Sequence, residues 1–149
     1  MDDLRITDDE VETYRLAQLW VRKHEGLRLF PYTDTVGKLT IGYGRNLVDR
    51  GLAITEAELM LQNDLHFAEV DARSFTGPAF ETLSAPRRAV VVDMAFNLGL
   101  TRLRQFTRFR EALGQGDFET AAREMLDSRW ATQVGQRALT LADTMRTGK

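Results

Sequence analysis

The sequence predicts an α+β fold in which a small antiparallel sheet precedes a larger set of helices. Residues 27–47 are rich in Thr, Tyr and Gly and contain Pro31, a composition typical of short strands and turns. Before and after this stretch, apolar residues recur at helical spacing. One sheet near the start with helices thereafter indicates the α+β class, and 149 residues suit one domain.

The first helix has a clear start signal. Thr7-Asp8-Asp9-Glu10 has the spacing of a capping box, with Thr7 as the N-cap and Glu10 three residues later. Apolar residues then recur every three or four positions, which predicts a helix from Asp8 to about Glu25. Gly26 lies where a helix commonly ends in a residue with positive φ.

Two strands and a turn are expected next. Leu29, Phe30 and Tyr32 indicate the first strand, and residues 38–43 indicate the second. Residues 34–37, Asp-Thr-Val-Gly, form the expected turn between them.

A long helix and an apolar helix follow. Thr55-Glu56-Ala57-Glu58 resembles a second capping box and predicts a helix to about Ser74, broken at Gly77-Pro78. Ser84, followed by a proline in the first turn, starts the next helix, which Gly99 should end. This helix is apolar on nearly all sides, so we expect it at the centre of the core.

Three shorter helices complete the expected fold. The first should cover about 107–113 and close at Gly114, the second 118–127 with Asp117 as its cap, and the third about 135–145.

The whole chain is predicted to be one domain with two lobes and a cleft. Residues of about 26–54 would form the small sheet lobe, and residues 1–25 and 75–149 the helical lobe. A connecting helix would cover about 55–74.

Composition excludes several classes of protein. The absence of cysteine excludes a disulfide scaffold, a thiol nucleophile and a cysteine-rich zinc site. Two histidines, His24 and His66, argue against a histidine-based metal site, so no metal or cofactor is expected. No apolar run approaches the roughly 18 residues of a membrane span, so we expect no stable membrane association. The protein is also expected to be a monomer.

Charge is divided unevenly along the chain. Residues 1–80 carry nine Lys/Arg and fourteen Asp/Glu, a net charge of -5, whereas residues 81–149 carry eleven and eight, a net charge of +3. The total of -2 argues against a nucleic-acid binder. The basic second part favours a polyanionic partner, with a chance distribution on a solvated surface as the alternative.

Three residues could carry hydrolytic chemistry. Glu25, Asp34 and Thr40 are spaced Glu-x8-Asp-x5-Thr, at the end of the first helix and in the expected hairpin. Hydrolysis of a glycosidic bond needs one carboxylic acid to protonate the leaving oxygen and a second carboxylate across the sugar ring. The alternative is that Glu25 is a surface residue and Asp34 only forms the turn.

The surrounding residues resemble the active-site signature of phage-type lysozymes, glycoside hydrolase family 24. The resemblance lies in His24-Glu25-Gly26-Leu27-Arg28-Leu29-Phe30-Pro31-Tyr32-Thr33-Asp34, then Gly37, then Leu39-Thr40-Ile41-Gly42-Tyr43-Gly44. Later blocks follow in the family's order: Ala85-Pro86-Arg87-Arg88-Ala89, Ala95-Phe96-Asn97-Leu98-Gly99, Phe106-Thr107, Ser128-Arg129-Trp130, Arg137 and Arg146-Thr147-Gly148. The resemblance therefore runs from about residue 14 to the C-terminus.

The resemblance implies a muramidase mechanism. Glu25 would be the general acid, and Asp34 with Thr40 would position or activate water. The bond cut would be the β-1,4 link between N-acetylmuramic acid and N-acetylglucosamine in peptidoglycan. Partial burial of Glu25 is expected, with Arg137 beside it. The family also favours inversion, which predicts carboxyl groups roughly 6.5–9.5 Å apart.

Other residues receive substrate-binding roles from the resemblance. Phe96 and Asn97 would line the saccharide cleft, although core packing is an equal alternative for Phe96. Arg129 would meet the peptide stem or acidic groups of the wall, unless it is only a solvated side chain. Trp130 is expected to pack in the C-terminal lobe.

Two glycines and two departures, Arg45 and the segment Gln133-Val134-Gly135-Gln136 before Arg137, complete the comparison with the family. Gly42 and Gly44 are expected to permit close backbone approach and a bend rather than to contact substrate. Arg45 departs from the lysozymes of the T-even phages, which carry a histidine there, so no histidine–aspartate pair is expected.

The predicted function is that of a phage or prophage endolysin. A lytic transglycosylase and a wall-binding protein without activity are alternatives, and the Asp34 and Thr40 pair argues against both. A nucleic-acid binder built on the basic second part is a third. The acidic N-terminus does not resemble a signal peptide, so we expect the host cytoplasm, with a holin needed before the enzyme reaches the periplasm and cell wall.

Overall fold

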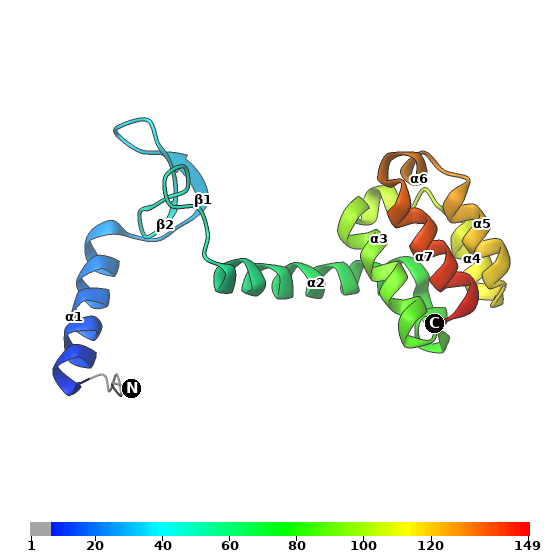
Figure 1. Cartoon of the computed structure of the whole chain (residues 1–149), viewed down its shortest axis with the longest axis horizontal. Helices are drawn as coiled ribbons and strands as arrows, with labels where there is room; N and C mark the ends of the chain where they lie inside the picture. The colour runs from blue at the N-terminus through cyan, green and yellow to red at the C-terminus, as the bar shows by residue number, and fades with distance from the viewer. Residues whose placement is uncertain (1–6) are drawn as a thin grey trace. The chain divides into compact units, whose positions relative to one another are not determined.

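The computed structural model describes residues 7–149 and confirms the α+β class (Figure 1). The first part contains α1 (Asp8–Glu25), β1 (Arg28–Thr33), β2 (Leu39–Gly42) and β3 (Arg45–Asn46). The long helix α2 (Ile54–Thr76) and the 3-10 helix η1 (Gly77–Thr82) follow. The remaining helices are α3 (Ala85–Leu103), α4 (Thr107–Gln115), α5 (Phe118–Leu126), α6 (Arg129–Val134) and α7 (Gln136–Thr147).

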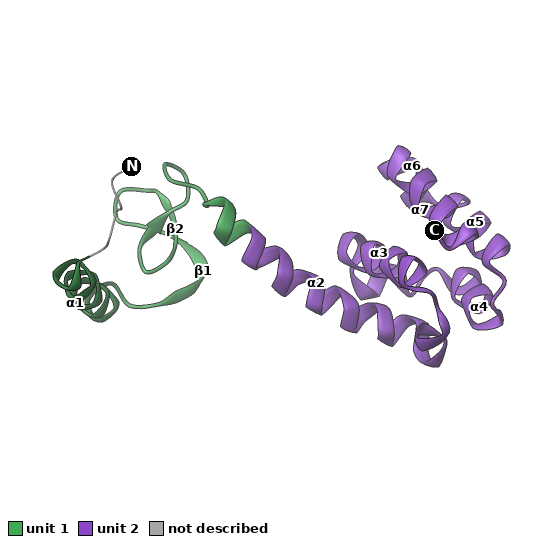
Figure 2. Ribbon diagram, turned by 60° about the horizontal axis from the view of Figure 1, so that its bottom comes forward, with its two compact units in different colours: residues 1–57 green, residues 58–149 purple. Residues whose placement is uncertain are grey.

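The chain divides into two compact units, Met1–Ala57 and Glu58–Lys149 (Figure 2). The division falls inside α2, and each unit is described by itself. The expected grouping of residues 1–25 with 75–149 in one lobe stays a prediction, and its residues 1–6 lie outside the described part of the chain.

The predicted start and end of α1 are confirmed. The hydroxyl of Thr7 accepts a hydrogen bond from the Glu10 backbone N–H at 3.2 Å, and the Glu10 carboxylate accepts one from the Thr7 N–H at 2.8 Å. These two bonds satisfy donors that a helix start otherwise leaves unpaired. The helix ends at Glu25 because Gly26 turns the chain with φ 69°.

The sheet of the first unit has the order β1-β2-β3 and is antiparallel throughout. The two predicted strands and the turn between them are confirmed, and Tyr32 pairs with Thr40 across β1 and β2. Strand β3 was not predicted, because two residues are too few to show an alternating pattern. Its pairing places Asn46 opposite Thr40, so β2 is the central strand.

The predicted capping box at the start of α2 is wrong in its register. The helix begins at Ile54, so Thr55 lies inside it. The carboxylate of Glu56, rather than Glu58, accepts the N-terminal bond, from the Ala53 backbone N–H at 2.7 Å. Glu56 is the third residue of the helix, which places its carboxylate at the Ala53 N–H, and the same carboxylate also accepts from Arg45.

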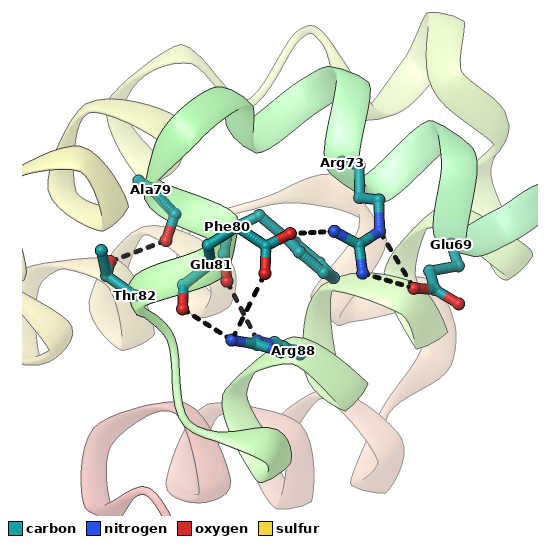
Figure 3. Close-up of polar contacts among 7 residues, drawn as sticks. All are labelled: Glu69, Arg73, Ala79, Phe80, Glu81, Thr82 and Arg88. Carbon is teal, nitrogen blue, oxygen red and sulfur yellow. Dashed lines mark hydrogen bonds and ion pairs between the residues drawn. The ribbon is translucent and has the colours of Figure 1, made fainter.

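Arginines hold the junction between α2, η1 and α3 (Figure 3). Arg73 forms ion pairs with Glu69, one turn earlier in α2, and with Glu81 in η1. Its guanidinium also lies 4.6 Å from the centre of the Phe80 ring. From α3, Arg88 donates to the backbone carbonyls of Phe80 and Glu81. The break predicted at Gly77-Pro78 is therefore a short 3-10 helix that is fixed on both sides.

The apolar helix α3 lies in the core, as predicted. It begins after Ser84, and Gly99 departs from helical geometry with φ 71° and ψ 161°. The chain then returns to helical geometry as far as Leu103, so the helix extends beyond the end predicted at Gly99.

The shorter helices are confirmed with two corrections. Helix α4 runs through Gly114 and closes at Gly116, whose φ of 68° and ψ of 18° are left-handed. Gly114 has no positive φ, so the prediction that the helix closes at Gly114 was wrong. Helix α6 was not predicted, because six residues hold fewer than two turns. The Asp117 cap of α5 is confirmed, since its carboxylate accepts from the Thr120 N–H at 3.0 Å.

One apolar core holds the second unit together. Helix α7 packs against α3, α5 and α6, and α4 packs against α5. Inside this arrangement the Phe75 ring of α2 stacks on Phe109 of α4, with centroids 6.0 Å apart. The largest fully buried side chains are Phe75, Phe80, Phe109, Met94, Leu103, Leu113, Met125, Met145, Val90 and Val91. Within residues 7–149, no helix is long and apolar enough to cross a membrane.

Replacing Phe109 by alanine should destabilise the second unit by about 3–5 kcal/mol, because the ring is fully buried and the helices cannot close the cavity. Urea unfolding measured by circular dichroism checks this. Phe67→Ala is the matched control, since its ring is 68% exposed in the same unit and its loss should cost far less.

Candidate active site

The carboxyl group of Glu25 lies against the backbone of Gly44. Glu25 is the last residue of α1, and Gly44 lies in the turn between β2 and β3. A Cβ atom added to Gly44 would stand 3.1 Å from Oε2 of Glu25, and Gly44 has φ +77°. Both the close approach and the positive φ require glycine here. This confirms that Gly44 permits close backbone approach.

Asp34 organises the turn that precedes β2. One of its carboxylate oxygens, Oδ1, accepts hydrogen bonds from the backbone N–H groups of Val36 at 2.9 Å and Lys38 at 2.7 Å. Asp34 therefore forms the turn, as one of the two interpretations of the sequence predicted. Among residues 7–149 no hydrogen bond reaches Oδ2, so that oxygen is available to a water molecule.

Thr40 is a buried polar residue in the centre of the sheet. Only 3% of its surface is exposed, and its hydroxyl donates to the backbone carbonyl of Lys38 at 3.0 Å. Because the hydroxyl proton is used in this bond, the oxygen can serve an incoming water only as an acceptor. The strand pairing and this bond fix the position of that oxygen.

The expected partial burial of Glu25 is not found in the first unit, where its side chain is exposed. The physical reason is that a glycine, which has no side chain, is the neighbour on which the carboxyl lies. Gly44 supports the carboxyl from one side and removes little water from it.

Arg45, the residue that departs from the T-even pattern, forms a two-pronged ion pair with Glu56. Its Nη1 and Nη2 lie 2.9 Å and 2.6 Å from the two carboxylate oxygens, and Nη1 also donates to the Gly51 carbonyl at 3.1 Å. The Arg45 guanidinium, together with the Ala53 backbone N–H, lowers the pKa of Glu56 to about 2. The pair therefore keeps its charge through the acidic range down to that pH.

Three of the four predicted substrate-binding residues, Phe96, Asn97 and Arg137, can be described by their exposure or their polar partners in the second unit. The Phe96 side chain is 45% exposed, so the core-packing alternative is wrong. Asn97 accepts a hydrogen bond from the Trp130 indole N–H at 2.9 Å, and Trp130 is buried, as predicted. Arg137 forms an ion pair with Asp93 at 2.9 Å. Its predicted place beside Glu25 stays a prediction.

Arg129 lines a cavity of about 550 Å³ in the second unit. It is the first residue of α6, which Ser128 caps by accepting from the Ala131 N–H at 3.1 Å. The cavity wall combines aromatic rings, including Trp130, with polar and charged groups, including Gln133 and Asp127. Arg129 is exposed there and forms no ion pair within residues 7–149.

Comparison with known families agrees with the motif. The family described as phage lysozyme matches residues 22–145, which include Glu25, Asp34 and Thr40. The chain belongs to the phage lysozyme family. Its α+β fold is therefore lysozyme-like, and its enzyme class is that of the glycoside hydrolases.

Several relatives illustrate the range of this family. The chain is 26% identical to the pre-baseplate central spike protein Gp5 of Enterobacteria phage T4, over 96% of the chain but only 29% of the spike protein. It is 23% identical to probable T4-type lysozyme 1 of Dictyostelium discoideum, covering 83% of the chain and 89% of that protein. It is 30% identical to an endolysin of Acyrthosiphon pisum secondary endosymbiont phage 1, covering 78% and 80%.

The sequence did not predict the partners of Arg45 and Asn97. The Arg45–Glu56 pair joins residues eleven positions apart, and the Asn97–Trp130 bond joins residues 33 apart. The Gly51 and Glu56 contacts had one available signal, an arginine in place of the expected histidine with an acid shortly after it. Nothing in the local pattern indicated the Asn97–Trp130 bond.

Replacing Gly44 by alanine should reduce activity as well as stability. The positive φ costs roughly 1–2 kcal/mol for an L-residue, and the new methyl group must displace the Glu25 carboxyl. Gly116→Ala is the matched control, because Gly116 has φ +68° with open space around its Cβ position and lies at the end of α4. Both variants should lower the midpoint of thermal unfolding similarly, but only Gly44→Ala should lower kcat. Equal kcat values would contradict a catalytic need for this contact.

Proposed function

We propose that this member of the family hydrolyses the β-1,4 bond between N-acetylmuramic acid and N-acetylglucosamine in bacterial peptidoglycan. The observation that carries the proposal is that Glu25 lies on Gly44, in the turn that directly follows the strand containing Thr40. Asp34 forms the turn that directly precedes that strand. One small sheet therefore organises the acid, the second carboxylate and the hydroxyl together.

The proposed reaction begins with proton transfer from the Glu25 carboxyl to the glycosidic oxygen. Oδ2 of Asp34 and the hydroxyl oxygen of Thr40 accept hydrogen bonds from a water molecule and orient it. The water oxygen bonds to the anomeric carbon as the glycosidic bond breaks, and Asp34 takes up the water proton. This single displacement inverts the anomeric carbon and requires carboxyl groups roughly 6.5–9.5 Å apart.

A general acid must be protonated when substrate binds, and Glu25 is exposed in the first unit. We propose that the bound saccharide itself excludes water from the carboxyl, since desolvation favours the neutral acid. Gly44 leaves the space above the carboxyl open to such a substrate.

Four residues of the second unit are proposed to bind substrate: Phe96, Asn97, Arg129 and Arg137. The exposed Phe96 ring can lie against the apolar face of a sugar. The Asn97 oxygen is occupied by Trp130, which fixes the side chain and leaves its NH₂ group to read an N-acetyl carbonyl. Arg129 lines the cavity that Asp127 also lines, and it forms no ion pair within residues 7–149, so its guanidinium is proposed to bind a carboxylate of the substrate.

The segment 102–110 offers a further contact with the anionic wall. It contains four exposed arginines and no acid: Arg102, Arg104, Arg108 and Arg110. None of the four forms an ion pair within residues 7–149, whereas Arg73, Arg88 and Arg137 of the same unit are paired. A group of unpaired surface arginines attracts polyanions, most strongly at low salt.

The biological setting is proposed to be host cell lysis. The similarity to an endolysin supports a role in lysis. The enzyme is proposed to wait in the host cytoplasm as a monomer. A holin would permeabilise the membrane and let it reach the periplasm and the cell wall. No direct contact with the holin is proposed, and no metal or cofactor takes part in the mechanism.

A second setting is favoured by one observation. The spike protein of phage T4 matches 96% of this chain within a protein more than three times as long. A lysozyme domain carried by the virion would cut the wall during infection rather than during lysis. Mass spectrometry of purified virions distinguishes the two, since a free endolysin should not be found in them.

Glu25→Gln and Asp34→Asn should each lose at least about 100-fold in kcat on purified peptidoglycan, with folding unchanged. The Asn side chain can still accept the two turn bonds, so its effect would report on Oδ2. Glu12→Gln on the same helix is the control for Glu25→Gln and should keep full activity. Analysis of the released sugars should find reducing N-acetylmuramic acid formed with inversion. A 1,6-anhydro product would indicate a transglycosylase instead.

Binding to the wall should depend on salt through the 102–110 segment. A triple variant Arg104→Gln, Arg108→Gln and Arg110→Gln, made in inactive Glu25→Gln protein, should bind isolated sacculi several-fold more weakly at low salt. The difference should vanish at about 1 M salt, where screening is nearly complete. The control removes the same charge at Arg15, Arg73 and Arg146, each of which has an acidic partner. Equal weakening by both triples would show that only net charge matters.

A further inference from the structure

We propose that Arg45 is a positioning residue for the general acid, because it holds the Gly44 backbone in place beneath the Glu25 carboxyl. The inference rests on the proposed role of Glu25 and adds to the reaction a residue outside the Glu, Asp and Thr motif.

The first step is the sensitivity of Glu25 to the position of Gly44. The missing Cβ of Gly44 would lie 3.1 Å from Oε2 and 3.5 Å from the carboxyl carbon of Glu25. The carboxyl is exposed on its other sides and accepts no hydrogen bond from residues 7–149. The Gly44 backbone therefore limits the carboxyl on that side, and a shift of the turn changes the space that the carboxyl can occupy.

The second step is the anchorage of the chain directly after Gly44. Arg45 pairs with Ile41 in the sheet, and its guanidinium makes three hydrogen bonds beyond the sheet. Two of these go to the carboxylate of Glu56 and one to the carbonyl of Gly51. The planar guanidinium thus fixes β3 to the first turn of α2 in both distance and direction.

The third step is that the acceptor is itself fixed. Glu56 receives the Ala53 backbone N–H at 2.7 Å in addition to both prongs of Arg45. Together these contacts close residues 45–56 into one loop that starts next to Gly44 and ends in a helix. The other ion pair of this loop, Lys38 with Asp49, is a single contact of 3.2 Å and cannot impose a direction in the same way.

The pair is better suited to positioning than to stabilisation. The Arg45 and Glu56 side chains are 30% and 38% exposed, and ion pairs at that exposure contribute little to folding free energy. The low pKa of Glu56, about 2, keeps the pair charged at any pH above that value. The support of Gly44 therefore does not change with pH in that range.

The test compares Arg45→Met, Arg45→Lys and Glu56→Gln with the control Arg15→Met. Arg15 also forms a two-pronged pair, with Glu12 on α1, so its loss removes a similar interaction away from Gly44. Each variant is assayed for kcat and KM on purified peptidoglycan, under conditions in which the variant is fully folded. In protein labelled with ¹³C at the glutamate carboxyl groups, the Glu25 resonance is followed through a pH titration.

We expect Arg45→Met and Glu56→Gln each to lower kcat about 10-fold with KM within a factor of two, and the double variant to lose no more than either one. Arg45→Lys should recover only part of kcat, because lysine supplies the charge without the fork. The Glu25 resonance and its titration midpoint should shift in these variants but not in Arg15→Met.

The proposal is overturned if Arg45→Met keeps kcat within a factor of two, or if Arg15→Met lowers kcat equally. An unshifted Glu25 resonance in folded Arg45→Met and Glu56→Gln protein would overturn it as well. The resonance does not depend on catalysis, so it separates this inference from the proposed function. If Glu25→Gln proves active, the proposed function fails even when the resonance shifts as expected.

Discussion

The contact between the Glu25 carboxyl and the Gly44 backbone is the constraint on which the first unit depends. A Cβ atom at Gly44 would stand 3.1 Å from Oε2 of Glu25, so a side chain there would push the carboxyl away. Helix α1 ends at Gly26, which makes Glu25 its last residue. With a glycine on one side, the Glu25 carboxyl stays exposed on its others in the first unit.

Asp34 and Thr40 show how a small sheet can serve structure and chemistry with the same atoms. Oδ1 of Asp34 closes the turn and the Thr40 proton closes a bond inside the strand, so neither group can rotate freely. What remains on each is an acceptor oxygen with a fixed position. The turn-forming and the catalytic readings of Asp34 therefore describe two oxygens of one carboxylate and do not compete.

The second unit separates its apolar interior from a surface that carries uncompensated positive charge. Aromatic and methionine side chains fill the centre, and paired arginines such as Arg73 and Arg88 hold the helix junctions (Figure 3). The arginines of segment 102–110 form no such pairs within the described part of the chain. Positive charge is therefore paired at the helix junctions and unpaired in segment 102–110 of the described chain.

The sequence by itself determined the α+β class, both ends of α1, the hairpin and the family, because caps, turns and alternating strands are local patterns. It misplaced the start of α2 and the end of α4, and it missed β3 and α6, where short elements or neighbouring candidates make local signals ambiguous. Only the tertiary structure decided that Glu56 pairs with Arg45 and that Gly44 lies under Glu25. Those choices depend on residues distant in the chain, which no local pattern specifies.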